Sequence, residues 1–555
     1  MIKVGYINPT GIPSRAEFNY HWMLFKCFYE DYGKYPEKVT WVEPIFKWNE
    51  VTIQDCLDNV KGCSIVFFTN YVWNYKINQR IRNGLDSDTI VVMGGPQQDP
   101  DIIKDYDYVA DPLAPGEIFV QYFLDMYLED SVDKKKIPFY LGSSLKIPLP
   151  FGHTNVYKRC EDYFTKEYKH FIKNIDLYER ITLIYESTRG CPFKCSYCEW
   201  GGGTGTKVLK KPMAVIKDEM EFIGRFKGVH IDLCDANTGM FKERDREMMM
   251  HMVDNGVQIG ENLSVLKTLK LEQKKEMLDF MIEHDITRQV ISISLQSISP
   301  EARKIANRRD LNVEETYELV DHLTNKWNNF KEKELWLDLE LILAMPGSTL
   351  KDFYEEFKVY YRVGYNEGKD WEEWKGLDVW ADTRYPYMVL PATETASKEY
   401  QEKYKIKTSK VLTQFDGNYS GKWDDVEVNP IYGDVAYEYD TIIECFSYTF
   451  EEYLEMFIMN LFTPHIGLSF ISEYTTYENV SEVAKELWNI LNDIPMFFVY
   501  KELIRNIFYD KNPHSIDKFD VGRFKGKDIV NEMKILLNKN EEMIKERLDE
   551  FCRNL

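Results

Sequence analysis

Residues 181–198 read "ITLIYESTRGCPFKCSYC". The segment 181–187 is short, apolar and rich in β-branched residues, which is typical of a buried strand in a parallel sheet. A polar loop follows at once and carries three cysteines, Cys191, Cys195 and Cys198. This order predicts that the three thiols lie together on a loop at the C-terminal end of a strand.

Three thiols on one tight loop favour an iron–sulfur cluster. Cysteine thiolates are the usual ligands of iron, and three of them can hold three irons of a [4Fe–4S] cluster while the fourth iron binds another ligand. Structural zinc is one alternative, but it requires a closed set of four ligands, usually two separated Cys/His pairs, and no second pair follows here. Inert buried cysteines are a further alternative. The loop is polar because it contains Pro192, Lys194 and Ser196, which argues against inert buried cysteines.

Outward from this loop, residues 181–385 alternate strand-like and helix-like segments. Six such units predict an incomplete (β/α) barrel, a fold that places function at the C-terminal ends of its strands. The strand-like segments are "ITLIYES" (181–187), "GVHIDLCD" (228–235), "LSVLKTL" (263–269), "QVISISLQS" (289–297), "LWLDLELILAMPG" (335–347) and "GLDVWAD" (376–382).

The region before the barrel shows a second α/β pattern. Residues 1–145 contain short apolar strands separated by helical stretches, which predicts a doubly wound, Rossmann-like parallel sheet. Ligands of such sheets bind beyond the C-terminal ends of the strands. Residues 146–180 mix Pro, Gly, Lys and aromatic residues and are interpreted as a linker. Residues 386–555 show helical periodicity and are interpreted as a helical C-terminal domain.

Composition limits the classes of partner. The 555-residue chain has a formal net charge of −22, so its surface repels nucleic acid and anionic membranes. No apolar stretch approaches the roughly 20 residues that cross a bilayer. The start of the chain lacks the features of a signal peptide, and the ten cysteines are few and mostly isolated, which suits a reducing compartment. These observations predict a cytoplasmic location.

The cysteine loop, with Tyr197 before its last cysteine, resembles the signature of radical S-adenosylmethionine (SAM) enzymes. Three later motifs match that family in order, each at the end of a predicted strand: "CDANTG" (234–239), "SLQS" (294–297) and "LILAMPGST" (341–349). The resemblance covers about residues 181–385. It implies that SAM is bound by Tyr197, Gly201, Gly202, Gly203, Asp235, Asn237, Ser294 and Gln296.

The resemblance also implies a reaction. In that family the open iron chelates the amino and carboxylate groups of SAM, and an electron from the cluster cleaves SAM to methionine and a 5′-deoxyadenosyl radical. The glycines after the cysteines allow backbone N–H groups to approach the ligand closely. The chain departs from the family at one point. Many relatives carry an acidic residue after the glycine pair, whereas Gly203 and Thr204 follow here, and Glu199 is not an obvious substitute.

Three segments of the N-terminal region follow one another at the ends of predicted strands: "FFTNYVWN" (67–74), "VVMGGPQQD" (91–99) and "APGE" (114–117). With these segments, the region resembles the cobalamin-binding domain that precedes the barrel in a large radical SAM subfamily. The motif that supplies a histidine to cobalt, D-x-H-x-x-G, is missing after the first strand, so no histidine is expected below the cobalt. The alternative is a domain that kept the fold and lost the cofactor. The residues implied to bind cobalamin are Asn8, Tyr71, Val72, Trp73, Asn74, Gly94, Gly95, Pro96, Gln97, Gly116 and Glu117.

By this resemblance, the expected function is cobalamin-dependent methyl transfer to an unactivated carbon of a small molecule or peptide. A flavodoxin or ferredoxin is expected to supply electrons. Two alternatives remain: a radical rearrangement or oxidation without methyl transfer, and a cluster-bearing binding protein that does not cleave SAM. Whether SAM yields 5′-deoxyadenosine, S-adenosylhomocysteine or neither distinguishes them.

Overall fold

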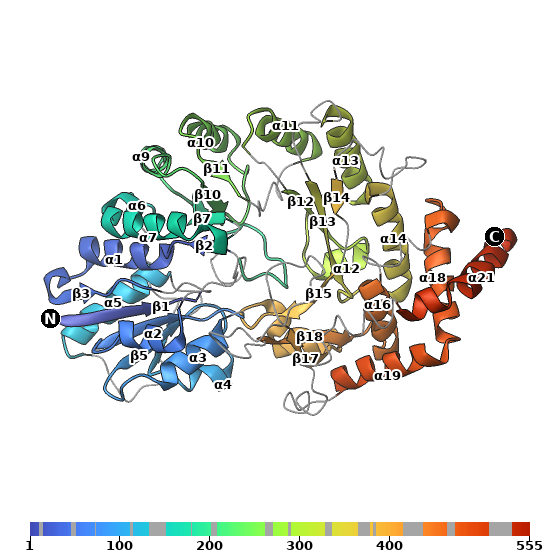
Figure 1. Ribbon diagram of the computed structural model, residues 1–555, viewed down its shortest axis with the longest axis horizontal. Helices are drawn as coiled ribbons and strands as arrows, with labels where there is room; N and C mark the ends of the chain where they lie inside the picture. Colours follow the sequence, from blue (N-terminus) through green and yellow to red (C-terminus); the bar gives the residue numbers. More distant parts are fainter. Residues whose placement is uncertain are drawn as a thin grey trace.

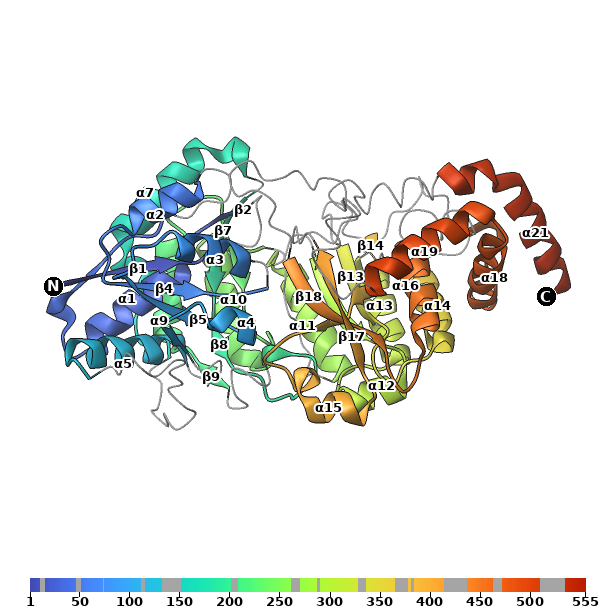
Figure 2. The same ribbon diagram turned by 90° about the horizontal axis from the view of Figure 1, so that it is seen from below.

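A computed structural model gives the fold of the chain. The structure describes residues 1–9, 15–45, 51–72, 74–110, 115–131, 151–178, 180–200, 208–260, 270–286, 290–327, 336–364, 378–380, 384–413, 437–462, 472–509 and 535–555. The N-terminal and C-terminal ends of the chain lie at opposite ends of the long axis, with the barrel region between them (Figures 1 and 2). Among the described residues, no helix is both long and apolar enough to span a bilayer.

The N-terminal region forms a five-stranded parallel sheet with helices on both faces. Its strands, in sheet order, are β3 (Val39–Trp41), β1 (Ile2–Ile7), β4 (Ile65–Thr69), β5 (Ile90–Gly94) and β6 (Tyr108–Val109). Because side chains alternate along a strand, Phe67 faces the core on one side and Phe68 the core on the other. This sheet confirms the predicted doubly wound class.

The helices divide between these two faces. On the face shared with the rest of the molecule lie α1 (Tyr20–Tyr32) and α5 (Gly116–Leu128). On the other face lie α2 (Ile53–Asn59), α3 (Tyr75–Asn83) and α4 (Pro100–Ile103).

The next region is a partial barrel of parallel strands with helices outside. Its strands are β7 (Arg180–Tyr185), β10 (Val229–Leu233), β11 (Gln258–Ile259), β12 (Val290–Gln296), β13 (Trp336–Leu343), β14 (Asp378–Trp380) and β15 (Arg384–Pro386). Its helices are α9 (Met213–Ile223), α10 (Lys242–Asp254), α11 (Leu271–Glu283), α12 (Pro300–Ile305), α13 (Val313–Trp327) and α14 (Leu350–Gly364). Figure 1 shows these units following one another from green to yellow. The predicted partial barrel is confirmed.

The third barrel strand differs from the prediction. The strand beside β10 is β11, at Gln258–Ile259, which the sequence analysis did not identify because only two residues pair. The segment 263–269, predicted to be this strand, falls outside the described residues.

The N-terminal region also supplies a strand to the barrel. Strand β2 (Arg15–Glu17) pairs in parallel with β7, with Ala16 opposite Ile181 and Glu17 opposite Thr182. The ladder continues through the Phe18 N–H, which donates to the Thr182 carbonyl at 3.3 Å. This short strand was not predicted from the sequence. The two regions therefore share a sheet.

Most of the predicted linker is helical. Within residues 146–180, α6 (Val156–Arg159) and α7 (Glu161–Lys173) are formed, followed by a 3-10 turn at Ile175–Leu177. Phe164 is fully buried and stacks on Phe18 with ring centroids 4.1 Å apart. The segment was interpreted as a linker from its Pro and Gly content. Its aromatic residues instead fill the core between α1 and the barrel.

The C-terminal region combines helices with a small sheet that the sequence analysis did not predict. The sheet is antiparallel, in the order β16 (Met388–Val389), β18 (Tyr437–Glu444) and β17 (Lys407–Thr413). The helices are α15 (Lys398–Lys403), α16 (Phe450–Phe462), α18 (Val480–Asn492), α19 (Pro495–Tyr509) and α21 (Glu541–Asn554). They pack with α14 into a second hydrophobic core, beside the barrel in Figure 2.

Candidate functional site

The three-cysteine loop leaves the C-terminal end of β7. Strand β8 (Thr188–Arg189) pairs antiparallel with β9 (Leu209–Lys210), so this ladder closes the base of the loop. Cys191 is buried, and Cys195 and Cys198 are half-buried. The Cys198 N–H donates to the Cys195 carbonyl at 3.1 Å, which keeps these two residues in a tight turn. The thiols thus lie on one loop beyond β7, as the sequence predicts.

The three cysteines fit the ligands of an iron–sulfur cluster better than the ligands of a single metal ion. Among the described residues, no three His, Cys, Asp or Glu side chains converge as the ligands of one metal ion would. Cysteine ligands of a [4Fe–4S] cluster each bind a different iron, so their sulfur atoms surround the cluster and do not need to meet at one metal ion. The Arg308 guanidinium lies within hydrogen-bonding reach of Cys195, and a cation stabilises an anionic thiolate.

Arg308 is a residue of this site that the sequence analysis missed. Its Nη2 donates to the Ser294 carbonyl at 2.6 Å and to Asp310 Oδ2 at 2.8 Å, so it ties the end of β12 to the cysteine loop. The available signal was a basic residue that follows the "SLQS" motif closely in sequence.

Backbone contacts dock the middle of the loop onto neighbouring elements. The Ser196 N–H donates to the Ala306 carbonyl at 3.0 Å, just after α12. The Asn307 amide donates to the Lys194 carbonyl at 3.0 Å. Thr395, in the C-terminal region, donates to the Ser196 carbonyl through its N–H at 3.0 Å and its hydroxyl at 2.9 Å. The turn after α12 and the C-terminal region thus both fix the position of the loop.

Asp235 holds the corner between β7 and β8. Its carboxylate accepts from the Ser187 N–H at 2.7 Å, from the Thr188 N–H at 2.8 Å and from the Ser187 hydroxyl. Burial raises the pKa of Asp235 to about 6, against the lowering effect of these hydrogen bonds. The resemblance assigned Asp235 to SAM. Here its carboxylate binds the backbone that precedes the cysteines.

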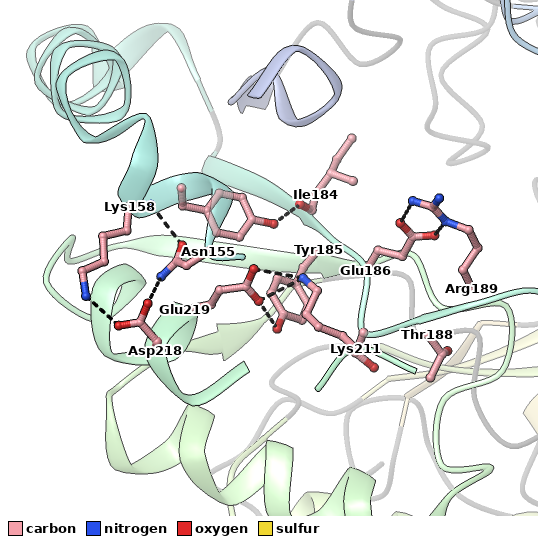
Figure 3. Close-up of polar contacts among 12 residues, drawn as sticks. Asn155, Lys158, Ile184, Tyr185, Glu186, Thr188, Arg189, Lys211, Asp218 and Glu219 are labelled. Carbon is pink, nitrogen blue, oxygen red and sulfur yellow. Dashed lines mark hydrogen bonds and ion pairs between the residues drawn. The ribbon is translucent and has the colours of Figure 1, made fainter. Parts of the chain in front are cut away.

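A second buried group supports the same corner from the other side. The Lys211 N–H and Arg244 Nη2 both donate to the Ser187 carbonyl, at 2.9 and 2.8 Å. Lys211 Nζ forms a buried ion pair with Glu219 at 2.9 Å, and the Tyr185 hydroxyl donates to the same carboxylate at 2.7 Å (Figure 3). The base of the loop is therefore rigidly anchored.

Two predicted SAM residues meet at a third residue. The Ser294 hydroxyl donates to Glu340 Oε2 on β13, and Gln296 Nε2 donates to the same oxygen at 3.2 Å. Gln296 has a positive φ of 68°, which ends β12 with a turn that L-residues rarely adopt. Glu340 was missed because it belongs to another strand, and its contacts give no local sequence signal.

The other predicted SAM residues lie nearby. Tyr197 is largely buried and packs edge-on against Tyr387, with ring centroids 6.2 Å apart. Asn237 is buried just beyond β10. Gly201, Gly202 and Gly203 lie outside the described residues. The described candidates therefore gather at the C-terminal ends of the barrel strands, and their roles in binding SAM stay predictions.

Tyr71, just after β4, lies near residues of the barrel mouth. Burial raises the pKa of Tyr71 well above its ordinary value, and the nearby Cys234 thiol and Glu199 carboxyl raise it further. Cys234 follows β10, and Glu199 follows the last cysteine of the loop. Burial also raises the pKa of Glu199 to about 7. Tyr71, predicted to contact cobalamin, thus lies at the junction between the two regions.

Hydrogen bonds between loops shape the edge of the N-terminal sheet. Asn74 Nδ2 donates to Asn8 Oδ1 at 3.3 Å and to the Pro9 carbonyl at 3.1 Å, while Asn74 Oδ1 accepts from the Tyr71 N–H at 2.8 Å. Asn8 and Asn74 therefore join the loops after β1 and β4. Val72 and Gln97 are buried in the loops after β4 and β5. Trp73 lies outside the described residues.

Gly94 and Gly95, both predicted to contact cobalamin, differ in the space around their Cα atoms. Gly95 has φ +91°, and a Cβ there would lie 2.3 Å from the Asn70 carbonyl oxygen, so only glycine fits. A Cβ on Gly94 would meet nothing closer than 3.9 Å, so a methyl group fits there without a clash. Pro96 continues this turn and is partly exposed. A cofactor that approaches the backbone beyond β5 fits this arrangement.

Gly116 and Glu117 contact protein groups. A Cβ on Gly116 would lie 3.0 Å from the Phe25 ring, so this glycine allows α5 to pack on α1. Glu117 Oε1 accepts from Arg189 Nη1 at 2.5 Å and is 4% exposed. Both residues were assigned to cobalamin by the resemblance, and in the structure both connect elements of the protein.

Comparison with known proteins finds relatives of the barrel region. Residues 185–358 match the model of the radical SAM superfamily. The cobalamin-dependent radical SAM methyltransferase TokK of Streptomyces tokunonensis is 22% identical over 386 residues, covering 66% of this chain and 52% of TokK. The 2-(S-pantetheinyl)-carbapenam-3-carboxylate methyltransferase of Streptantibioticus cattleyicolor is 21% identical over 350 residues, covering 59% and 48%. The chain spans about half the length of these curated relatives.

Solved structures agree on the fold. The radical SAM methyltransferase TsrM of Kitasatospora setae, solved with tryptophan and a SAM analogue, matches with a TM-score of 0.52 at 13% identity, covering 75% of this chain and 79% of TsrM. The cobalamin-dependent SAM radical enzyme OxsB, solved with aqua-cobalamin and SAM, matches with a TM-score of 0.53 at 13% identity, covering 100% and 80%. These matches confirm the predicted architecture.

Proposed function

We propose that this chain, whose residues 185–358 form a radical SAM domain, is a cobalamin-dependent radical SAM enzyme that methylates an unactivated carbon of a small molecule or peptide. The observation that carries this proposal is the ion pair between Arg189, two residues before Cys191, and Glu117, in the first turn of α5. It joins the base of the cysteine loop at the barrel mouth to the ligand-binding edge of the N-terminal sheet. Cofactors held at these two edges would face each other across one space, as methyl transfer between them requires.

The names of the relatives support methyl transfer. Both curated relatives are named as methyltransferases, and one is named as cobalamin-dependent. The matches cover about half the length of each relative, so the relatives' substrates are not assigned to this chain. When bound, a [4Fe–4S] cluster and SAM would supply a substrate radical, and cobalamin would supply the methyl group.

The chain's own residues would hold and orient these groups. Cys191, Cys195 and Cys198 would ligate the cluster, with Arg308 compensating its negative charge. Tyr197, Asn237, Ser294 and Gln296 would contact SAM. The turn at Gly94 and Gly95 would admit cobalamin to the backbone beyond β5. The buried corner at Ser187 would keep the loop in place while SAM binds.

The remaining expectations concern partners. We propose that a flavodoxin or ferredoxin supplies the electrons and that the enzyme works in the cytoplasm. The ten cysteines are few for 555 residues and mostly isolated in the sequence, which supports a reducing compartment.

The test is the fate of SAM. Protein purified without oxygen, reconstituted with iron, sulfide and hydroxocobalamin and then reduced, should convert SAM to both 5′-deoxyadenosine and S-adenosylhomocysteine, measured by mass spectrometry. 5′-Deoxyadenosine alone would indicate a radical reaction without methyl transfer, and neither product would indicate a binding protein. Cys191→Ala should lose the cluster absorbance and both products, whereas the matched control Cys56→Ala, at a buried cysteine far from the loop, should keep them.

A further inference from the structure

Arg189 contacts carboxylates from two different regions of the fold. It lies on β8, two residues before Cys191. Toward the barrel, its Nε and Nη2 each donate to one oxygen of Glu186, both at 2.7 Å, as Figure 3 shows. Toward the N-terminal region, its Nη1 donates to Glu117 Oε1 at 2.5 Å. A single guanidinium thus joins the two regions at the base of the cysteine loop.

This three-residue group is buried. The side chains of Arg189, Glu186 and Glu117 are 14%, 12% and 4% exposed. The Cζ atom of Arg189 lies over the Phe151 ring, 4.7 Å from the ring centroid. A buried ion pair that loses one partner leaves an uncompensated charge, which is strongly destabilising. Without Arg189, the two carboxylates would face each other with no cation between them.

The two ends of the group lie beside the two expected cofactor positions. Glu117 lies in the first turn of α5, at the edge of the N-terminal sheet where cobalamin is proposed to bind. Arg189 pairs with Leu209 in the ladder that closes the cysteine loop. A displacement of the first turn of α5 would therefore be transmitted to the residues that precede Cys191.

We propose that Arg189 is a positioning residue that couples cobalamin binding in the N-terminal domain to SAM binding at the cysteine loop. This inference rests on the proposed function, because it requires both cofactors. Cobalamin bound at the sheet edge fixes the first turn of α5, and Arg189 passes this constraint to β8, at the base of the cysteine loop where SAM is expected to bind. Coupling between two binding sites is reciprocal, so each cofactor raises the affinity for the other by the same factor.

The test measures this factor by calorimetry on the cluster-reconstituted protein. In the wild type, saturating hydroxocobalamin should lower the Kd of SAM by about fivefold or more, the lower end of common coupling factors. Glu117→Gln and Arg189→Gln should both bring the factor close to one. Glu117→Gln keeps the size and hydrogen-bonding capacity of the side chain and should retain the cluster absorbance. Arg189→Lys, which keeps the charge but loses the two-bond contact to Glu186, should restore part of the coupling.

The control is Lys158→Gln, which removes the exposed ion pair between α6 and Asp218 seen in Figure 3. It should leave the coupling factor unchanged. A wild type that binds both cofactors without coupling overturns the inference, and so does full coupling in Glu117→Gln.

A wild type that does not retain cobalamin overturns the proposed function instead. In that case hydrogen exchange of the protein without added cofactors decides the inference. Glu117→Gln should speed amide exchange in residues 186–191, and Arg189→Gln should speed it in residues 115–120. Unchanged exchange in both segments overturns the role of Arg189 as a connection.

Discussion

Two carboxylates at the barrel mouth, the buried Asp235 and the partly buried Glu340, hold neighbouring protein groups in place. Asp235 accepts three hydrogen bonds from Ser187 and Thr188, and Glu340 accepts from Ser294 and Gln296. A carboxylate accepts several bonds at once, so each can fix more than one neighbour. At the scale of single residues, these carboxylates hold the residues that are expected to touch the cofactor.

Asp235→Asn tests the first of these roles. Its amide oxygen can still accept from the Ser187 and Thr188 N–H groups, but its amide nitrogen would face the Ser187 hydroxyl, which then loses its acceptor. Leaving a buried donor unpaired costs about 1–3 kcal/mol, so the midpoint of thermal unfolding and the iron content should both fall. Ser187→Ala, which removes only the hydroxyl, should have the smaller effect. If Asp235→Asn is stable and fully loaded with iron but binds SAM weakly, Asp235 contacts SAM directly.

Glu340→Gln tests the second role. We expect SAM affinity to fall about tenfold, equivalent to about 1.4 kcal/mol, with the cluster retained, as measured by calorimetry. Because Gln296 acts through the same contact, Gln296→Ala combined with Glu340→Gln should weaken SAM binding by less than the product of the two single effects. Fully additive effects would mean that Glu340 and Gln296 act independently.

At the scale of elements, how much the sequence predicts depends on how local the contacts are. The cysteine loop could be predicted because its three ligands lie within eight positions after a clear strand. Strand β2 could not, because it has only three residues and its pairing energy comes from β7, far along the chain. For α7, the Pro and Gly residues before it suggested a linker. Its burial depends on a stacking contact with Phe18 that no local pattern reveals.

The turn after β5 gives a test at this scale. Gly94→Ala should leave the midpoint of thermal unfolding nearly unchanged, since a Cβ there has no neighbour closer than 3.9 Å, but should weaken hydroxocobalamin binding if the cofactor lies above it. Gly95→Ala should destabilise the fold, because its Cβ would collide with the Asn70 backbone. Gly62→Ala is the control: φ is +72° but the space is free, so only the strain of about 1–2 kcal/mol remains. Unchanged cobalamin affinity in Gly94→Ala would remove this turn from the site.

At the scale of the whole molecule, one hydrophobic core runs through the N-terminal region and the barrel. It contains Tyr6 and Phe67 of the N-terminal sheet together with Ile181 and Leu233 of the barrel. The predicted boundary between residues 145 and 146 therefore separates sequence patterns, while the packing continues across it. Arg189 adds a buried polar connection to this shared core.

A fragment experiment tests this continuity. Residues 146–555 expressed alone lack β2, α1 and α5 and should aggregate, because removing them exposes the face of the barrel that they cover. The full chain, cut by a protease at a site inserted within residues 132–150, should instead elute from gel filtration as one complex of two pieces. A soluble, monomeric fragment that cleaves SAM would show that the two regions fold independently.

The parallel ladder between β2 and β7 has a consequence for synthesis on the ribosome. Ala16 leaves the exit tunnel early, yet its partner Ile181 is translated only after the whole N-terminal sheet. At ordinary elongation speeds of about 5–20 residues per second, β2 waits roughly 10–30 seconds for its neighbour. During that interval a nascent chain presents an unpaired strand and the apolar face of α1 to the cell. Slow codons placed before residue 181 would lengthen this vulnerable period, and a chaperone that binds nascent chains would have its clearest target there.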